Sequence, residues 1–411
     1  MRIAIVNQPL GNRGDEAAHR AIIRSLAKKF NKAQIDVIFL NEKQQLIDDF
    51  VVESDLVRYI NLNGLIKASH KCMKLTMVRN NMLFTFLHPL LRKFDRIITK
   101  YDCVICAPGG ICMGGFMKWD HIWQLYVALK HNIKTIYWGR SIGPFSDEDA
   151  EHLEFKRISR SLIKCFDYIS LRDDTSFKIA KTFGVSSDLT VDSAFLETPD
   201  CSIPEYVVKK IGTMPYVIFV PNELIWHYKY KDKSKKCIDE FYLYVIEALV
   251  YAFPGHCIVM LPQTCKSVIN DYGYFVSLRE QSKYKNKIIV IDENQGSDIQ
   301  QCVIRNSHFV VGARYHSVIF AINNNVPFLS LSYEHKMKGM LKTLNLNDRQ
   351  VDIENIFNNT DTPVALDVLR EIKNKLNSVT SVNMESDRAK NMVCSAFDRM
   401  CVHIEDGVYH E

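Results

Sequence analysis

The chain lacks the features that define several large classes of protein. None of its apolar runs approaches the roughly 20 residues that a membrane-spanning helix needs. It begins "MRIAIVNQPLGNRGDEA", where further charge follows within about a dozen positions, so we expect a first strand and not a signal peptide. The 52 Lys and Arg exceed the 47 Asp and Glu by only five charges, and this mild excess alone predicts no nucleic-acid partner.

Motifs that would indicate a metal, a cofactor or a familiar hydrolase are also missing. There is no Walker phosphate-binding motif, Ser-His-Asp order, zinc-ligand spacing or carboxylate pair, and the loop after the first strand is not Gly-x-Gly-x-x-Gly. The twelve cysteines are scattered. Cys103 and Cys106 form a Cys-x-x-Cys, but residues three apart in a strand point to opposite faces and no second pair accompanies them. We therefore predict buried structural thiols, no metal, no cofactor and a reducing cytoplasm.

The chain does have the composition of an ordinary globular protein, in a length that favours two domains. It contains 411 residues, of which 47% are hydrophobic and 24% charged. Apolar runs of strand length alternate with helical patterns in two series. The first series predicts strands at 2–7, 35–40, 102–107, 134–139, 168–172 and 187–192, with helices at 15–29, 118–131, 147–164 and 174–182. The second predicts strands at 216–221, 257–262, 287–292, 308–312 and 327–332, with helices at 237–252, 296–304, 315–324 and 335–344.

This alternation predicts an α/β protein with two doubly wound, Rossmann-like domains that face a cleft. We place the N-terminal domain at 1–197 and the C-terminal domain at 198–380, with the proline-containing segment 196–206 as the linker. A last helical pattern within 381–411 follows the second sheet, and in two-lobed proteins of this kind such a helix often crosses back to the first lobe. Ligands of doubly wound sheets bind at the C-terminal ends of strands, so the informative residues should directly follow the strands.

In the first domain, glycine and arginine recur at these positions. Glycine allows a backbone to approach a ligand closely, and arginine binds anions, as a helix N-terminus does. The candidates are Asn12, Arg13 and Asp15 after the first strand, Gly109, Gly110, Gly114 and Gly115 after the third, Arg140 after the fourth and Arg172 after the fifth. A capped turn, with Asn12 or Asp15 as the cap, explains the first loop equally well, and Asp173 should cap the helix after Arg172.

In the second domain, cations and a histidine follow neighbouring strands. Gln263 follows the second strand, "GARYH" supplies Arg314 and His316 after the fourth, and Tyr333 and Lys336 follow the fifth. A lone histidine at such a place more often caps or packs at a helix start, but cations at neighbouring strand ends favour a site. Arginine and lysine bind carboxylate and phosphate oxygens, and histidine can donate a proton near neutral pH. The pattern predicts a cationic clamp with one acid or base.

Several segments resemble the polysaccharide pyruvyl transferase family. They are "GNRGDEA" (11–17), "GRSIGPF" (139–145), "SLRDDTS" (170–176), "VDSAF" (191–195) and "GARYHSVIFAINNNVPFLSLSYEHKMKG" (312–339), and they occur in the family's order. The resemblance implies a fold of the GT-B type. It also implies transfer of pyruvate from phosphoenolpyruvate to a sugar diol of a cell-surface glycan or its lipid-linked precursor, which forms a cyclic ketal and releases phosphate.

The resemblance further implies roles for single residues. The family's mid-chain arginine falls on Arg172, its Arg-x-His on Arg314 and His316, and its following lysine on Lys336. His316 would then be the acid that protonates the methylene carbon, while the cations hold the donor's anionic groups, and closure of the two lobes would bring Arg172 to the site. Asp15 and Glu16 are the candidate bases for the acceptor hydroxyl.

The chain departs from the family in two turns of the first domain. "GRSIGP" stands where the family often has a Gly-Gln-Gly turn, so that Arg140 replaces an amide, and "APGG" stands where it commonly has three glycines. The acceptor and its placement are therefore open. The alternative function is a GT-B nucleotide-sugar glycosyltransferase, which shares the architecture and the cationic strand ends. A non-catalytic glycan-assembly scaffold is disfavoured by the intact set of Arg172, Arg314, His316 and Lys336.

One further segment suggests a partner. Residues 67–100 hold eight Lys and Arg against a single acid, Asp95, and enclose the apolar "MLFTFLHPLL". This run is too short to span a bilayer but could lie on an anionic surface. We predict peripheral contact with the inner face of the membrane; a solvated face over a core-facing stripe is the alternative.

Overall fold

The computed structural model describes residues 1–64, 66–114, 116–227, 229–264, 270–292, 295–354, 356–357, 366–378 and 382–406. Its internal contacts divide the chain into two compact units. Unit 1 consists of Met1–Leu10, Ala18–Leu196 and Asn391–Glu411, and unit 2 of Gly11–Ala17 and Glu197–Lys390. The division after Leu196 lies next to the predicted boundary, but the segment 11–17, which we had given to the first domain, belongs to unit 2.

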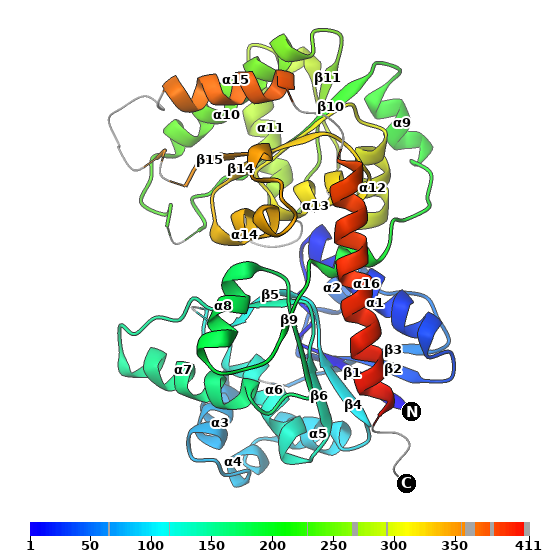
Figure 1. Cartoon of the computed structure of the whole chain (residues 1–411), viewed down its shortest axis with the longest axis vertical. Coiled ribbons are helices and arrows are strands. Elements are labelled where there is room, and N and C mark those ends of the chain that lie inside the picture. Colours follow the sequence, from blue (N-terminus) through cyan, green and yellow to red (C-terminus); the bar gives the residue numbers. More distant parts are fainter. Residues whose placement is uncertain are drawn as a thin grey trace. The chain divides into compact units, whose positions relative to one another are not determined.

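Unit 1 is built on a parallel sheet with the strand order β3-β2-β1-β4-β6-β8-β9 (Figure 1). Its strands are β1 (Arg2–Val6), β2 (Gln34–Leu40), β3 (Val57–Leu62), β4 (Cys103–Cys106), β6 (Lys134–Tyr137), β8 (Tyr168–Leu171) and β9 (Asp188–Leu189). The chain starts in the middle, winds to one edge and then to the other, which is the doubly wound order. β4 is buried at every position, as expected for a continuous apolar run in a sheet covered on both faces.

The helices of unit 1 are α1 (Arg13–Lys29), α2 (Gln44–Asp48), α3 (Ile66–Val78), α4 (Leu83–Phe86), α5 (Pro89–Ile98), α6 (Trp119–Lys130), α7 (Ala150–Ile163) and α8 (Asp174–Thr182), followed by the 3-10 helix η1 (Ser193–Leu196). Four of these helices, α1, α6, α7 and α8, match the predicted ones, whereas α2 to α5, between residues 44 and 98, were not predicted. Asp173 caps α8, as predicted, because its carboxylate accepts from the amide of Ser176 at 2.8 Å. The edge strand β3 was missed, because its exposed Arg58 interrupts the apolar pattern.

Two segments that we predicted as turns after neighbouring strands pair with each other. β5 (Gly109–Met113) and β7 (Arg140–Ile142) form a separate, parallel two-stranded sheet. The glycine-rich segment after β4 is therefore ordered in part by strand pairing, which the sequence did not predict.

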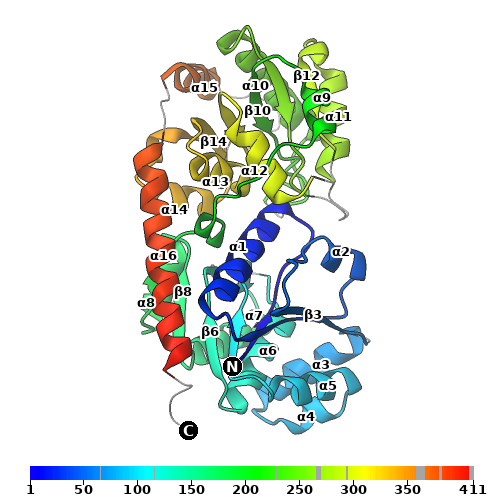
Figure 2. The same cartoon turned by 90° about the vertical axis from the view of Figure 1, so that its right-hand side faces the viewer.

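Unit 2 repeats the architecture with the strand order β12-β11-β10-β13-β14-β15, again parallel. Its strands are β10 (Tyr216–Val220), β11 (Cys257–Met260), β12 (Ile288–Val290), β13 (Val310–Gly312), β14 (Phe328–Ser332) and β15 (Gln350–Asp352). Its helices are α9 (Glu205–Ile211), α10 (Lys235–Ala252), α11 (Asp271–Gln281), α12 (Ser297–Arg305), α13 (Tyr315–Asn323), α14 (His335–Thr343) and α15 (Leu366–Ser378), with 3-10 turns η2 (Lys285–Lys287) and η3 (Asn347–Arg349). Figure 2 shows these helices in a second view.

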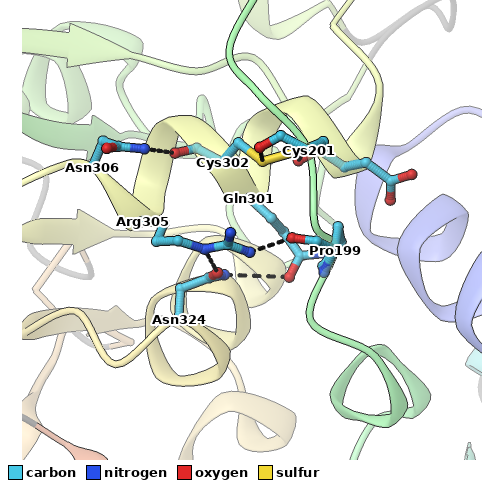
Figure 3. The surroundings of a disulfide bond; sticks show 8 residues. Pro199, Cys201, Gln301, Cys302, Arg305, Asn306 and Asn324 are labelled. Carbon is cyan, nitrogen blue, oxygen red and sulfur yellow. Dashed lines mark hydrogen bonds between the residues drawn. A yellow bond between two sulfur atoms is a disulfide. The ribbon is translucent and has the colours of Figure 1, made fainter.

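The linker is fastened to unit 2 by a disulfide that we did not expect. Cys201, in the linker, is bonded to Cys302 of α12, so the prediction of unpaired thiols was wrong for these two residues (Figure 3). Arg305 adds two contacts, to the carbonyl oxygen of Pro199 and, at 2.9 Å, to the side-chain oxygen of Asn324. Nine further cysteines of the described chain are free, and Cys103 and Cys106 are buried, as predicted. Cys265 lies outside the described residues.

The last helix, α16 (Asn383–Glu405), begins in unit 2 and continues into unit 1. Within unit 1 the hydroxyl of Tyr168 donates to the carbonyl oxygen of Ala396 at 3.0 Å, and Arg399 pairs with Asp188 at 2.5 Å. Lys134 donates to the carbonyl oxygen of His403. The C-terminal half of α16 thereby packs on the first unit.

Candidate functional site

In unit 1, the point where the strand order reverses lies between β1 and β4, and Arg140 fills it. The Arg140 Nη1 donates to the carbonyl oxygens of Asn7, after β1, at 2.8 Å and of Ala107, after β4, at 2.9 Å. Its Nε donates to the carbonyl oxygen of Gly110 at 2.9 Å. Only 2% of Arg140 is exposed. The residue that we predicted to bind substrate thus holds three backbone segments together, and these contacts explain it without a ligand.

The two glycines near Arg140, Gly139 and Gly110, differ in whether the structure requires glycine there. At Gly139 the φ angle is +52°, and a Cβ would lie 2.9 Å from the hydroxyl oxygen of Ser193, so a side chain would be strained and crowded. At Gly110 a Cβ would meet nothing within 4 Å, which leaves open space beside the strand end. Gly115 lies outside the described residues.

Arg172 is the centre of a buried polar network in unit 1. Directly after β8, its guanidinium pairs with the carboxylate of Asp192, and its Nε donates to the hydroxyl oxygen of Ser141 at 3.2 Å. Ser141 and Ser176 both donate to the Asp173 carboxylate, at 2.7 and 2.8 Å. The network joins three of the segments that carry the family resemblance, 139–145, 170–176 and 191–195. Sequence analysis quoted "VDSAF" but missed that its Asp192 is the partner of Arg172.

In unit 2, Arg314 is the N-cap residue of α13 and lies between an acid and an aromatic ring. The strand β13 ends at Gly312 and His316 falls in the first turn of α13, as predicted. The Arg314 guanidinium pairs with Asp271 and lies 5.5 Å from the centre of the Trp226 ring. Burial would lower the pKa of Arg314, but the Asp271 carboxylate raises the pKa above its ordinary value. The Arg314 guanidinium therefore stays protonated. The other Asp271 oxygen accepts from the amide of Gln263 at 3.0 Å.

Among the buried polar atoms of unit 2 that have no hydrogen-bond partner in the described part of the chain, three nitrogen donors belong to residues that closely follow strands. They are Nδ2 of Asn222, Nε2 of Gln263 and Nε of Arg314. They follow β10, β11 and β13, which are adjacent in the order β11-β10-β13, and β10 and β13 flank the point where the strand order reverses. Buried donors in proteins are almost always satisfied, and each unmet one costs about 1–3 kcal/mol. Because all three are donors, the partner they fit is an oxygen-rich or anionic ligand.

Tyr315 lies between Lys336, in the first turn of α14, and His316, in the first turn of α13. The Lys336 Nζ lies 5.7 Å from the Tyr315 ring, and that ring lies 5.1 Å from the His316 ring. Lys336 also pairs with Glu334 at 2.9 Å. Burial raises the pKa of the Glu334 carboxyl, but Lys336 outweighs this effect and keeps the pKa below its ordinary value. The predicted Tyr333 is almost fully buried; its ring packs 5.8 Å from that of His227, so its side chain supports the rim more than it lines it.

The segment 11–17 contributes to unit 2 and reaches His316. The Arg13 amide donates to the carbonyl oxygen of Gln263 at 2.8 Å. A Cβ placed on Gly14 would lie 1.8 Å from Cγ and Nδ1 of the His316 ring, so Gly14 and the imidazole are in direct contact. Two segments of the family resemblance, "GNRGDEA" and "GARYH", therefore meet.

The acidic residues of this segment are occupied. Asn12, not Asp15, caps α1, because its side-chain oxygen accepts from the Asp15 amide at 2.7 Å. Glu16 is fully buried, pairs with Arg13 at 2.6 Å and accepts from the amide and hydroxyl of Ser297 at 3.1 and 3.2 Å. The Arg13 guanidinium, which we predicted to bind an anionic ligand, is paired with Glu16 here, and Glu16 is a poor candidate for a base.

Other residues of the cluster were missed at the sequence level. Asp271 opens α11 and Trp226 lies in a lysine-rich segment, so neither has a local signal. His227, beside Glu334 and Lys336, has its pKa lowered by burial. Among the described residues, no group of three or more His, Cys, Asp and Glu could hold a metal ion.

The sequence matches the family model for polysaccharide pyruvyl transferase over residues 12–335. The chain belongs to this family. It is 25% identical over 383 residues to the amylovoran biosynthesis protein AmsJ of Erwinia amylovora, which covers 87% of this chain and 89% of that protein.

Solved structures with the same fold have much lower sequence identity. The UDP-GlcNAc 2-epimerase of Neisseria meningitidis, bound to UDP-GlcNAc, has a TM-score of 0.55 at 12% identity, covering 96% of this chain and 100% of that one. The UDP-GlcNAc 2-epimerase of Methanocaldococcus jannaschii has a TM-score of 0.55 at 11% identity, with the same coverage. At this identity the likeness shows the fold alone, which is the predicted GT-B type with two Rossmann-like domains. The predicted cleft between the domains stays a prediction.

Proposed function

We propose that the chain is a pyruvyl transferase that moves pyruvate from phosphoenolpyruvate to a sugar diol, forming a pyruvate ketal. The observation that carries the proposal is the cluster of unmet donors in unit 2, with Arg314 and His316 at the start of α13 and Lys336 at the start of α14, after the adjacent strands β13 and β14. Phosphoenolpyruvate presents a carboxylate and a phosphate, whose oxygens are acceptors that these donors fit. The proposed acceptor is a cell-surface glycan or its lipid-linked precursor, handled on the cytoplasmic side of a membrane.

In the proposed reaction His316 is the acid. It donates a proton to the methylene carbon of the enol, which makes the neighbouring carbon electrophilic. One sugar hydroxyl adds to that carbon and loses its proton, the carbon–oxygen bond to phosphate breaks, and a second hydroxyl adds and loses its proton to close the ring. Of the two protons released, one restores His316 and the other is taken up by the departing phosphate. Phosphate leaves with the electron pair of the broken bond. Arg314 and Lys336 hold the anionic groups and stabilise the leaving phosphate, and no metal or cofactor is needed.

The roles proposed for the two arginines differ in their support. Arg314 is fixed by Asp271 with its Nε still available as a donor. Arg172 is buried and compensated by Asp192, so any contact with phosphoenolpyruvate would have to use what this pair leaves accessible. Its part in donor binding remains a prediction from the family resemblance.

The decisive experiment distinguishes the role of His316 as an acid from the role of Lys336 in binding the donor. His316→Ala should lower transfer by roughly 10²–10⁴-fold while phosphoenolpyruvate binding stays within a few-fold of the parent, because loss of a general acid affects the rate more than the binding. Lys336→Ala should weaken phosphoenolpyruvate binding, and Lys336→Arg should not fully restore it, because the two cations present different geometries. Transfer is measured as released phosphate together with the mass of the product on lipid-linked and nitrophenyl sugars, and binding by calorimetry.

Two results would contradict the proposal. Near-normal turnover of His316→Ala would show that His316 is not the acid. If calorimetry shows that a nucleotide sugar binds to the parent chain and phosphoenolpyruvate does not, the glycosyltransferase function is favoured.

A further inference from the structure

The helices α3, α4 and α5 of unit 1 expose a surface with an unusual distribution of polarity. They pack together at one end of unit 1, at the bottom of Figures 1 and 2. α5 has the ordinary amphipathic arrangement, with Leu90, Leu91, Phe94 and Ile98 buried and its cations outside. α4 has the opposite arrangement.

On α4 the apolar face points outward. Leu83, Phe86 and Leu87 stand at helical spacing i, i+3 and i+4, and 68%, 46% and 69% of each residue is exposed. The polar Thr85 is instead fully buried, where its hydroxyl lies 3.3 Å from that of Thr76 on α3. This hydrogen bond holds the apolar face away from the core of unit 1. Exposed apolar groups of this size, gathered on one face, usually mark an interaction site.

The cations around this apolar face are not compensated. Six exposed residues form no ion pair with any described residue: Lys71, Arg79, Arg92, Lys93, Arg96 and Lys100. The single acid of the segment, Asp95, is buried and pairs with His131 at 2.8 Å. Lys74, another cation of the described segment, pairs with Glu151. Four of the six, together with Pro89 and Ile97, line a groove along α5.

We propose that this surface, formed by Leu83, Phe86 and Leu87 with the six uncompensated cations, docks on an anionic lipid bilayer. Leu83, Phe86 and Leu87 would enter the boundary between headgroups and acyl chains, and the cations would meet the headgroup phosphates. The predicted membrane contact of residues 67–100 is thereby assigned to a defined surface. This proposal does not depend on the reaction proposed for unit 2. Of the described residues, no helix is both long and apolar enough to traverse a bilayer, so docking at the surface is the mode that this face offers.

Two other occupants fit the surface less well. A second copy of the chain in a two-fold dimer would set the same patch against itself, so that uncompensated cations would face one another. A nucleic acid would satisfy the cations but would leave Leu83, Phe86 and Leu87 in water. Only a bilayer with anionic lipid satisfies both parts at once.

The test is co-sedimentation of the full chain with vesicles of phosphatidylcholine, with and without phosphatidylglycerol, at low and high salt. We expect binding that needs the anionic lipid and weakens with salt. Arg92→Gln/Lys93→Gln/Arg96→Gln should weaken it roughly 100-fold, since each cation near an anionic surface contributes about a factor of five. Leu83→Ser/Leu87→Ser should weaken it at both salt concentrations, because apolar insertion is not screened.

Matched controls come from unit 2. Lys209→Gln/Lys373→Gln/Arg388→Gln removes the same number of exposed charges and should bind vesicles as the parent does. Phosphate release on a soluble acceptor should be unchanged in all three variants, so a failure of the reaction cannot be confused with a failure of docking. Equal binding to neutral vesicles, or unchanged binding of both surface variants, would overturn the proposal. So would self-association, or nucleic-acid binding, that the surface variants abolish in a chain that ignores vesicles.

Discussion

At the scale of single residues, Gly14 and His316 form the most telling contact in unit 2. Their segments lie far apart in the sequence, yet the imidazole lies where a side chain at Gly14 would have to go. Glycine has no conformational advantage in a helix, and in a helix interior it costs about 1 kcal/mol against alanine. The glycine at position 14 is therefore explained by the His316 ring, which occupies the space that a side chain would need.

Gly14→Ala should displace His316 without harming the helix. The new Cβ would lie 1.8 Å from the ring, far inside any real contact, and the ring would rotate away. We expect transfer to fall about 10²-fold, the lower end of the loss of a general acid, while phosphoenolpyruvate still binds. Kinetics and calorimetry on the same preparation measure both quantities.

The matched control is Gly273→Ala in α11, another helical glycine, where a Cβ meets nothing within 4 Å. It should keep full activity and gain slightly in stability, as alanine does in a helix. Full activity of Gly14→Ala would show that the position of His316 is not critical.

At the scale of elements, the sequence predicted strand ends and helix caps, but not which arginine has which partner. Strand ends such as Gly312 and caps such as Asp173 have local causes, apolar runs and side-chain capping, so they could be predicted. The partners of the arginines have none. Arg140, Arg172 and Arg314 look alike in the sequence, but three carbonyl groups, Asp192 and Asp271 give them different surroundings. Only the tertiary structure shows that Arg140 occupies the point in unit 1 where the strand order reverses. At the corresponding point in unit 2, buried donors lack a hydrogen-bond partner among the described residues.

The network around Arg172 connects β8, β7 and the segment before η1, and its ion pair should be structural as well as functional. Asp192→Asn keeps the shape but leaves a buried guanidinium without its charge partner. Breaking a buried pair in this way typically costs about 3–5 kcal/mol. We expect that loss in the unfolding of unit 1, followed by tryptophan fluorescence, because Trp119, Trp123 and Trp138 all lie in this unit.

The control for this prediction is the double variant Arg172→Met/Asp192→Leu, which removes both charges and should recover part of the stability. A cost below about 1 kcal/mol for Asp192→Asn, the range of exposed pairs, would mean that the pair is not desolvated as the structure indicates. The result also sets the baseline for Arg172→Ala, whose effect on donor binding has to be measured on protein that is still folded.

At the scale of the whole molecule, two GT-B functions compete, and ligand protection distinguishes them. A ligand that binds only the folded state at 100 times its dissociation constant adds about 2.7 kcal/mol. For a unit of this size, each kcal/mol moves the melting temperature by about 2–4 °C, so phosphoenolpyruvate should raise it by about 5–10 °C. The His316→Ala chain should keep this shift and the Lys336→Ala chain should lose most of it, because only the second loses a charge that holds the donor. A UDP-sugar at the same concentration should give no shift. Protection by the UDP-sugar but not by phosphoenolpyruvate would reverse the assignment, since the nucleotide diphosphate would then be the anion that the unmet donors of unit 2 accept.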